Sequence, residues 1–126
     1  MKDIQELLLK IRELDGRLAL CSRCGLCMAH CPVYAQTGLE GDSPRGRMAL
    51  LESFARELIS DVSGLEEKIR KCLLCGACAA ACPANVPTRD IFFAARSAIT
   101  AYKGLSGFKK FFLRGLLANP TLFTFA

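Results

Sequence analysis

The sequence has no Trp, and aromatic residues make up only 8% of its 126 residues. Hydrophobic residues still reach 52%, so a core must depend on Leu, Ile, Ala and Phe. No run of about 18 apolar residues occurs, so we expect no membrane-spanning helix. The composition is too apolar for a disordered chain, and the length predicts one compact domain.

Acidic residues are in the minority, with 12 Asp and Glu against 17 Lys and Arg and a formal net charge of +5. No Lys/Arg run alternates with aromatic residues as in a single-strand binder, so we expect no nucleic-acid partner. Residues 1–6 mix charges and lack the apolar stretch of a signal peptide. We therefore expect a cytoplasmic, reducing location and leave open peripheral contact with the inner face of a membrane.

No cysteine lies outside two copies of one motif, C-x2-C-x2-C-x3-C-P, in which each Cys is displaced by 51 positions. The glycines and prolines of the motif repeat with it, as Gly25 and Gly76 and as Pro32 and Pro83. This spacing is typical of [4Fe–4S] ligation. The glycines are expected to let the backbone approach the cluster and adopt positive φ.

Three thiolates within seven residues can bind three corners of one cluster, while the fourth Cys of the motif ligates the other cluster in two-cluster ferredoxins. We therefore predict crossed ligation, which would make the clusters neighbours. The predicted sets are Cys21, Cys24, Cys27 and Cys82 for the first cluster, and Cys72, Cys75, Cys78 and Cys31 for the second. Each oxidised cluster with its thiolates carries roughly −2, which would bring the loaded protein close to neutral.

Zinc is the competing metal, because two four-thiolate sites would also use all eight cysteines. Zinc modules usually pair two C-x2-C knuckles over a longer loop, so three cysteines in a tight run with a distant fourth are unusual. A disulfide scaffold is disfavoured by the spacing and by the lack of a signal peptide.

Helical periodicity fills the remaining sequence and no segment alternates like a strand, so the expected fold is all-α. Gly16 is expected to end the first helix, and Val62-Ser63-Gly64 is expected to break the second helix. Thr88 is expected to cap the last helix. The expected helices cover residues 4–14, 44–58, 65–71 and 88–102. We expect a domain over residues 1–104, followed by a basic and apolar segment, residues 105–126, which docks on or leads to another domain.

Three further features are weaker candidates for a functional role. His30, the only His, could tune a cluster or carry a proton, but partly exposed packing is the more common role. Arg45 and Arg47 could neutralise cluster charge or hold a partner's carboxylates, or could simply be solvated side chains at a helix start. Arg89, near Pro83, is a similar candidate.

Taken together, these motifs resemble the N-terminal region of the glycolate oxidase iron–sulfur subunit family. The resemblance is carried by the two cysteine motifs with their long separation, by the helix start from Ser43 to Arg47, and by residues 111–123, where a basic helix is followed by Pro. Related families are the iron–sulfur subunits of lactate utilisation, anaerobic glycerol-3-phosphate dehydrogenase and heterodisulfide reductase. The resemblance implies an α-helical ferredoxin with two [4Fe–4S] clusters.

The family also implies a role: an electron carrier in a flavin-dependent 2-hydroxyacid dehydrogenase, with a flavoprotein subunit as partner. The downstream acceptor would be a cysteine-rich domain, a quinone or another carrier. Alternatives are a heterodisulfide reductase-like or glycerol-3-phosphate dehydrogenase-like subunit, or a redox-sensing or zinc-stabilised module. We expect no substrate catalytic site here, because no nucleophile–base pair or nucleotide loop is evident. Larger family members continue into domains with Cys-Cys-Gly motifs that this sequence lacks, which together with its apolar end suggests an excised domain.

Overall fold

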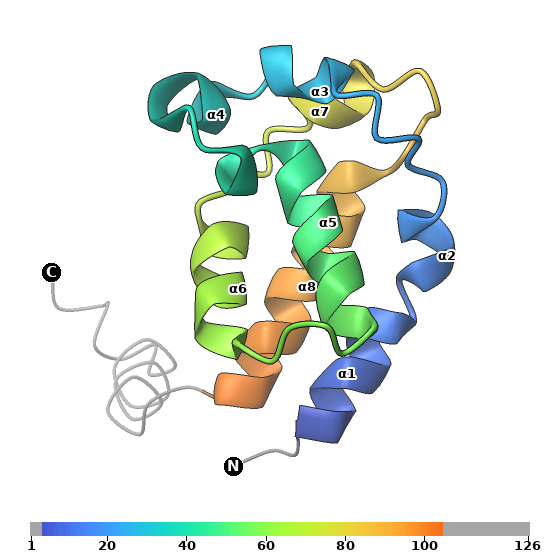
Figure 1. Ribbon diagram of the computed structural model, residues 1–126, viewed down its shortest axis with the longest axis vertical. Helices are drawn as coiled ribbons and strands as arrows, with labels where there is room; N and C mark the ends of the chain where they lie inside the picture. The colour runs from blue at the N-terminus through green and yellow to red at the C-terminus, as the bar shows by residue number, and fades with distance from the viewer. Residues whose placement is uncertain (1–3, 105–126) are drawn as a thin grey trace, which may run out of the picture.

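The structure, a computed structural model, describes residues 4–104 (Figure 1). These residues form eight α-helices and one 3-10 helix, and they contain no strand. The expected all-α fold is therefore confirmed. The elements are α1 Ile4–Arg12, α2 Asp15–Leu18, α3 Leu26–Ala29, α4 Pro32–Thr37, η1 Glu40–Asp42, α5 Pro44–Ala55, α6 Val62–Arg70, α7 Ala77–Ala80 and α8 Thr88–Lys103.

Helices α1, α5, α6 and α8 pack into a bundle, and the two cysteine runs lie together across one end of it (Figure 1). The short helices α3 and α7 contact each other there and α4 contacts α3, while α2 packs against α5 farther along the bundle. The described chain begins and ends at the opposite end of the bundle. The fold therefore brings two loops that are far apart in the sequence side by side.

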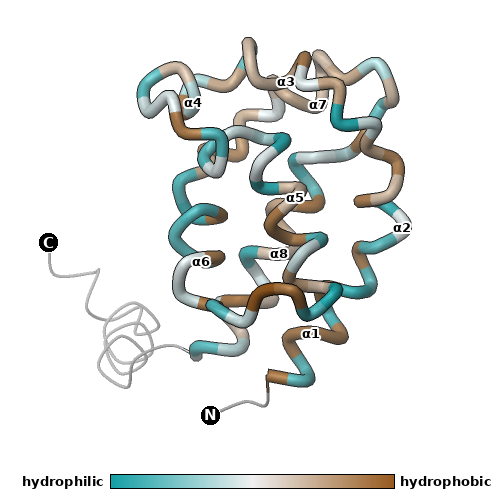
Figure 2. The backbone as a smooth tube through the Cα atoms, in the orientation of Figure 1, coloured by the Kyte–Doolittle hydropathy of each residue, from teal (hydrophilic) through white to brown (hydrophobic). Residues whose placement is uncertain are grey.

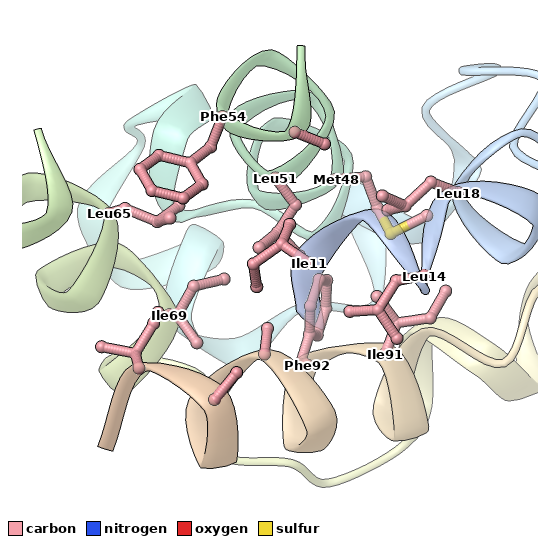
Figure 3. Packing of buried hydrophobic residues seen from close by; sticks show 14 of the residues in the cluster. Ile11, Leu14, Leu18, Met48, Leu51, Phe54, Leu65, Ile69, Ile91 and Phe92 are labelled. Atoms are coloured by element: carbon pink, nitrogen blue, oxygen red, sulfur yellow. The ribbon is translucent and has the colours of Figure 1, made fainter. Parts of the chain in front are cut away.

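The core fills the space between the four long helices (Figure 3). Each contributes side chains with almost no exposed surface: Leu7 and Ile11, Leu51 and Phe54, Leu65 and Ile69, and Ile91 and Phe92. Burial of one such side chain contributes about 1.5–3 kcal/mol. This packing fixes the helix ends from which the cysteine loops extend.

Helix α5 begins as expected but ends early. The Ser43 hydroxyl accepts a hydrogen bond from the Gly46 N–H at 2.9 Å, and Pro44 is the first helical residue. The helix ends at Ala55, and Glu57 has a φ of +59° that turns the chain away. Leu58, the last residue of the expected helix, therefore lies outside α5 and is 72% exposed, in the loop between α5 and α6 that is apolar only in its middle (Figure 2).

Two further predictions about helix ends are wrong. Gly16 lies inside α2 rather than ending α1, because the chain turns at Arg12 and resumes a helix that buries Leu18. The segment Val62-Ser63-Gly64 begins helix α6 rather than breaking a helix. The Asp61 carboxylate accepts hydrogen bonds from the Ser63 and Gly64 N–H groups, both at 3.0 Å, and caps this helix.

Helix α8 forms where a helix is expected, and it buries Ile91, Phe92, Ala95 and Ile99. Thr88, however, is its first residue and not its cap. None of the helices within residues 4–104 is long and apolar enough to cross a membrane. The basic and apolar segment predicted over residues 105–126 lies outside the described residues, so the domain boundary at residue 104 stays a prediction.

Candidate metal centre

The two cysteine loops follow the same backbone path. Gly25 and Gly76 have φ values of +83° and +80°, and Arg23 and Leu74, two residues before them, also have positive φ. A four-residue helix follows each glycine, α3 in the first loop and α7 in the second. The expectation of positive φ at both glycines is confirmed, and the sequence repeat is thus also a repeat of backbone conformation.

The eight cysteines surround two hollows on the loop end of the bundle. The first hollow, about 400 Å³ with its space open to solvent, is lined by Cys21, Cys24, Cys27 and Cys82 and also by Cys78. The second hollow, about 360 Å³ on the same measure, is lined by Cys31, Cys72, Cys75 and Cys78. Each predicted ligand set therefore lines one hollow, and Cys78 lies between the two.

Backbone N–H groups donate hydrogen bonds to some of these sulfur atoms. The Sγ atom of Cys31 accepts a hydrogen bond from the Tyr34 N–H at 3.5 Å, and that of Cys72 accepts one from the Leu74 N–H at 3.4 Å. The Leu26 backbone N–H is the main reason that the pKa of Cys24 lies below its ordinary value. Such N–H groups also stabilise thiolates bound to a metal.

At Cys27 and Cys78, burial raises the pKa and so disfavours the thiolate. For Cys27, the neighbouring Cys78 and Cys21 add to the effect of burial on the pKa. For Cys78, the Thr88 hydroxyl, 2.9 Å from its Sγ atom, opposes the effect of burial on the pKa. A bound metal supplies the positive charge that deprotonates such thiols.

The donor set fits a cluster better than a single ion. Within residues 4–104, no three Cys, His, Asp or Glu side chains converge closely enough to hold one metal ion. Tetrahedral zinc would need its four sulfurs about 2.3 Å from a single point. Four thiols spread around a hollow suit a [4Fe–4S] cluster, whose iron atoms each take one of them.

Gly46 explains the unusual helix start between the two loops. A Cβ atom on this residue would lie 1.9 Å from the carbonyl oxygen of Glu40, so only glycine allows η1 to pack against α5. The arginines on either side of it separate: Arg45 lines the first hollow and Arg47 lines the second. Helix initiation and a cationic lining of the hollows are therefore combined in one segment.

These arginines differ in environment. Arg45 is 33% exposed and forms an ion pair with Glu40 at 2.6 Å. Arg47 is 1% exposed, and its Nε donates to the Lys68 carbonyl oxygen at 2.7 Å. Arg89 and His30 line the second hollow as exposed side chains. Their predicted roles at the clusters stay predictions.

Two residues near the loops were missed from the sequence. The Nη2 of Arg96 donates to the carbonyl oxygens of Ile69, Arg70 and Cys72 at 2.9, 3.2 and 2.6 Å. It thereby fixes the end of α6 that leads into the second loop. Thr88, expected to be a helix cap, contacts Cys78 instead. Both contacts join segments at least ten positions apart, and no local pattern announces them.

Comparison with known proteins agrees with this arrangement. A family described as "4Fe-4S dicluster domain" matches residues 17–86, which include all eight cysteines. The chain is similar to the probable glycolate oxidase iron–sulfur subunit of Bacillus subtilis (strain 168), with 39% identity over 100 residues, covering 79% of this chain and 22% of the relative. The glycolate oxidase iron–sulfur subunit of Escherichia coli (strain K12) is 37% identical over 75 residues, covering 59% of this chain and 18% of the relative.

A more distant relative is a subunit of the dihydromethanophenazine:CoB–CoM heterodisulfide reductase of Methanosarcina mazei. It is 27% identical over 116 residues, covering 80% of this chain and 27% of the relative. The chain thus spans between 18% and 27% of the length of these three relatives. No solved structure matches it significantly. The repeated motif, the two cysteine-lined hollows and the family match lead to one conclusion: the chain belongs to the 4Fe-4S dicluster domain family, binds two [4Fe–4S] clusters and transfers electrons.

Proposed function

We propose that this chain carries single electrons from a flavoprotein subunit to a further acceptor in an enzyme that oxidises a 2-hydroxyacid such as glycolate or lactate. The observation that carries this proposal is the 39% and 37% identity to two glycolate oxidase iron–sulfur subunits. Hydroxyacid oxidation releases two electrons at once, whereas a [4Fe–4S] cluster accepts one. A flavin upstream of this chain would divide the pair.

The proposed ligand sets are Cys21, Cys24, Cys27 and Cys82 for the first cluster, and Cys72, Cys75, Cys78 and Cys31 for the second. Their support is geometric, because each set lines a separate hollow. In each loop the fourth cysteine follows the short helix, α3 or α7, and those two helices contact each other. Crossed ligands would therefore hold the clusters close together, as electron hopping requires.

We place the contacts with redox partners at the loop end of the bundle. Cys24 and Cys75 are exposed there, one from each ligand set. Electron transfer needs a partner's cofactor close to a cluster, and these two thiolates bring cluster edges nearest to solvent. The flavoprotein would dock near one of them and the acceptor near the other, in a cytoplasmic complex.

The direct test is anaerobic electron transfer from a flavoprotein. The purified, cluster-loaded chain would be mixed with an FAD-dependent 2-hydroxyacid dehydrogenase and glycolate or lactate. We expect the visible absorbance of the clusters to bleach only when flavoprotein and hydroxyacid are both present. Clusters that dithionite reduces but that the flavoprotein leaves oxidised would reject the proposed donor.

A second candidate rests on the similarity to the heterodisulfide reductase of Methanosarcina mazei, which extends over 80% of this chain. In that case the clusters would exchange electrons with a partner that reduces a disulfide. The same bleaching assay, run in reverse, distinguishes the two candidates. The second candidate would be favoured by two results together. The dithionite-reduced chain would be reoxidised by a heterodisulfide in the presence of a reductase subunit, and the oxidised chain would not be reduced by the flavoprotein and hydroxyacid.

A further inference from the structure

We propose that Arg47 donates a buried hydrogen bond to the cluster in the second hollow, and that this raises the reduction potential of that cluster above that of its neighbour. The proposal rests on the ligand assignment above, because the second hollow is the one lined by Cys31, Cys72, Cys75 and Cys78.

The first ground is an unsatisfied donor. Arg47 is 1% exposed, and its Nε donates to the Lys68 carbonyl oxygen at 2.7 Å. Its Nη2 is also buried but has no hydrogen-bond partner within residues 4–104. A buried N–H of a charged group without an acceptor is strongly unfavourable. Because Arg47 lines the second hollow, a cluster sulfur there would supply the missing acceptor.

The second ground is that the position of Arg47 is fixed by its surroundings. Its backbone N–H donates to the Ser43 carbonyl oxygen at 3.0 Å, in the first turn of α5. Gly46, the preceding residue, allows η1 to lie directly against this turn. The guanidinium is thus anchored on one side by the helix start and on the other by α6.

The third ground is the local charge balance. Asp42, also completely buried, is the acidic group near Arg47, but Lys68 and Lys71 contact its carboxylate at 3.2 and 3.6 Å. One buried carboxylate thus faces three cations, Lys68, Lys71 and Arg47, and it offsets only part of the Arg47 charge. Reduction adds one negative charge to a cluster, so a buried cation whose charge is only partly offset, together with a hydrogen bond, stabilises the reduced form more than the oxidised form.

Among the described residues, the first hollow has no equivalent of this group. Arg45 and Arg23 line it, but Arg45 is one-third exposed and paired with Glu40, and Arg23 is more exposed still and paired with Glu52. Solvent and the carboxylates weaken the effect of both charges on a nearby cluster. The second cluster therefore becomes the preferred resting place of the first electron.

The test is a redox titration of the complete, cluster-loaded chain, followed by electron paramagnetic resonance and driven by dithionite with mediators. We expect Arg47→Gln to lower the equilibrium constant for reduction of one cluster at least tenfold, which corresponds to a midpoint potential lowered by about 59 mV for one electron. The other midpoint should move much less. Arg47→Lys, which keeps the charge but not the planar fork, should give an intermediate shift.

Two controls separate tuning from a structural effect. Arg96→Gln removes hydrogen bonds to the end of α6, including the one to Cys72, without altering the lining of the second hollow. It should leave both midpoints nearly unchanged, as should Arg70→Gln, which removes an exposed positive charge that lines neither hollow. An Arg96→Gln shift as large as that of Arg47→Gln would overturn the proposal, and so would unchanged midpoints in Arg47→Gln with both clusters present.

If Arg47→Gln fails to retain its clusters, Arg47→Lys decides: an intermediate shift supports the proposal and unchanged midpoints overturn it. No flavoprotein takes part in the titration, so an error in the proposed enzyme would not affect the result. An error in the ligand assignment would be seen separately, because Cys31→Ser would then leave unchanged the cluster whose midpoint Arg47→Gln lowers.

Discussion

The loop that begins at Cys21 and the loop that begins at Cys72 have corresponding positive φ values and corresponding short helices, yet their surroundings differ. The first follows α2, a helix of only four residues, and its Arg23 forms an exposed ion pair with Glu52. The second follows α6, whose last carbonyl groups accept hydrogen bonds from two arginines of other helices. The repeat builds two similar cluster sites, and the rest of the bundle makes them unequal.

The two loops also diverge after their fourth cysteine. Cys31 is buried and caps α4, in which the Tyr34 N–H donates to its sulfur. Cys82, its counterpart, is only partly buried and begins a turn in which the Asn85 N–H donates to its carbonyl oxygen at 3.1 Å. A cluster that borrows Cys31 is therefore held by a more enclosed ligand than one that borrows Cys82.

Substitution of the crossed cysteine ligands should have the largest effect on the two cluster sites. We expect Cys82→Ser to damage the cluster bound by Cys21, Cys24 and Cys27, and Cys31→Ser to damage the other. Each variant should lose up to about half of its bound iron, because one cluster of two lacks a thiolate ligand. Iron and sulfide analysis with paramagnetic resonance measures this. Damage in Cys82→Ser confined to the cluster at Cys72, Cys75 and Cys78 would contradict crossed ligation.

A substitution between the loops should affect both hollows together. In Gly46→Ala the new Cβ atom would lie 1.9 Å from a backbone oxygen of η1, which cannot move aside easily. We expect the free energy of unfolding to fall by about 3 kcal/mol or more, at the upper end of overpacking effects. Anaerobic urea denaturation would measure it.

Gly16→Ala is the matched control for this substitution. It also replaces a helical glycine, but a Cβ atom there meets nothing within 4 Å. Stability should stay the same or rise by about 0.5–1 kcal/mol, since alanine loses less backbone entropy in a helix. Equal losses in both variants would show that the close approach of η1 to α5 is not what requires glycine at position 46.

The end of α6 offers a milder way to test the difference between the loops. Arg96→Gln should remove about 1.5–3 kcal/mol of stability, because charged hydrogen bonds to three carbonyl oxygens are lost. We expect the second cluster to be lost faster to an iron chelator, with the first little affected. Arg23→Gln, which breaks only an exposed ion pair beside the first loop, should cost less than about 1 kcal/mol. The opposite order of effects would mean that the first loop is the more firmly held.

The sequence was sufficient to predict what depends on local pattern. The repeated motif gives the two loops and the positive φ of their glycines, whereas the assignment of cysteines to each cluster stays a prediction. One local signal was overlooked, the cap at Asp61, which directly precedes Val62-Ser63-Gly64 and makes that segment a helix start. The prediction failed for a non-local reason at Thr88, whose hydroxyl contacts Cys78 ten positions away instead of capping α8. The inequality of the two sites was equally hidden, because Arg96 acts on carbonyl groups 24 to 27 positions away.

The smallest expected effect concerns acid stability beside the second loop. Burial alone would raise the pKa of Asp42, but the nearby positive charges of Lys68, Lys71 and Arg47 hold it below its ordinary value. A carboxyl group with a lowered folded-state pKa contributes stability that is complete above its unfolded pKa of about 3.9 and is lost as the pH falls through the folded value. Asp42→Asn should therefore flatten the acid limb of the unfolding curve.

The exposed Glu67 provides the control for that measurement, because it contacts the same Lys71 at 2.9 Å and its pKa is also lowered, chiefly by that lysine. Solvent screens this exposed pair, so Glu67→Gln should change the acid limb less than Asp42→Asn does. Both variants would be compared by urea denaturation across the acid range under anaerobic conditions. If they gave identical curves, the buried carboxylate would add nothing to the difference between the two loops, and the hydrogen bonds from Arg47 and Arg96 would have to account for it.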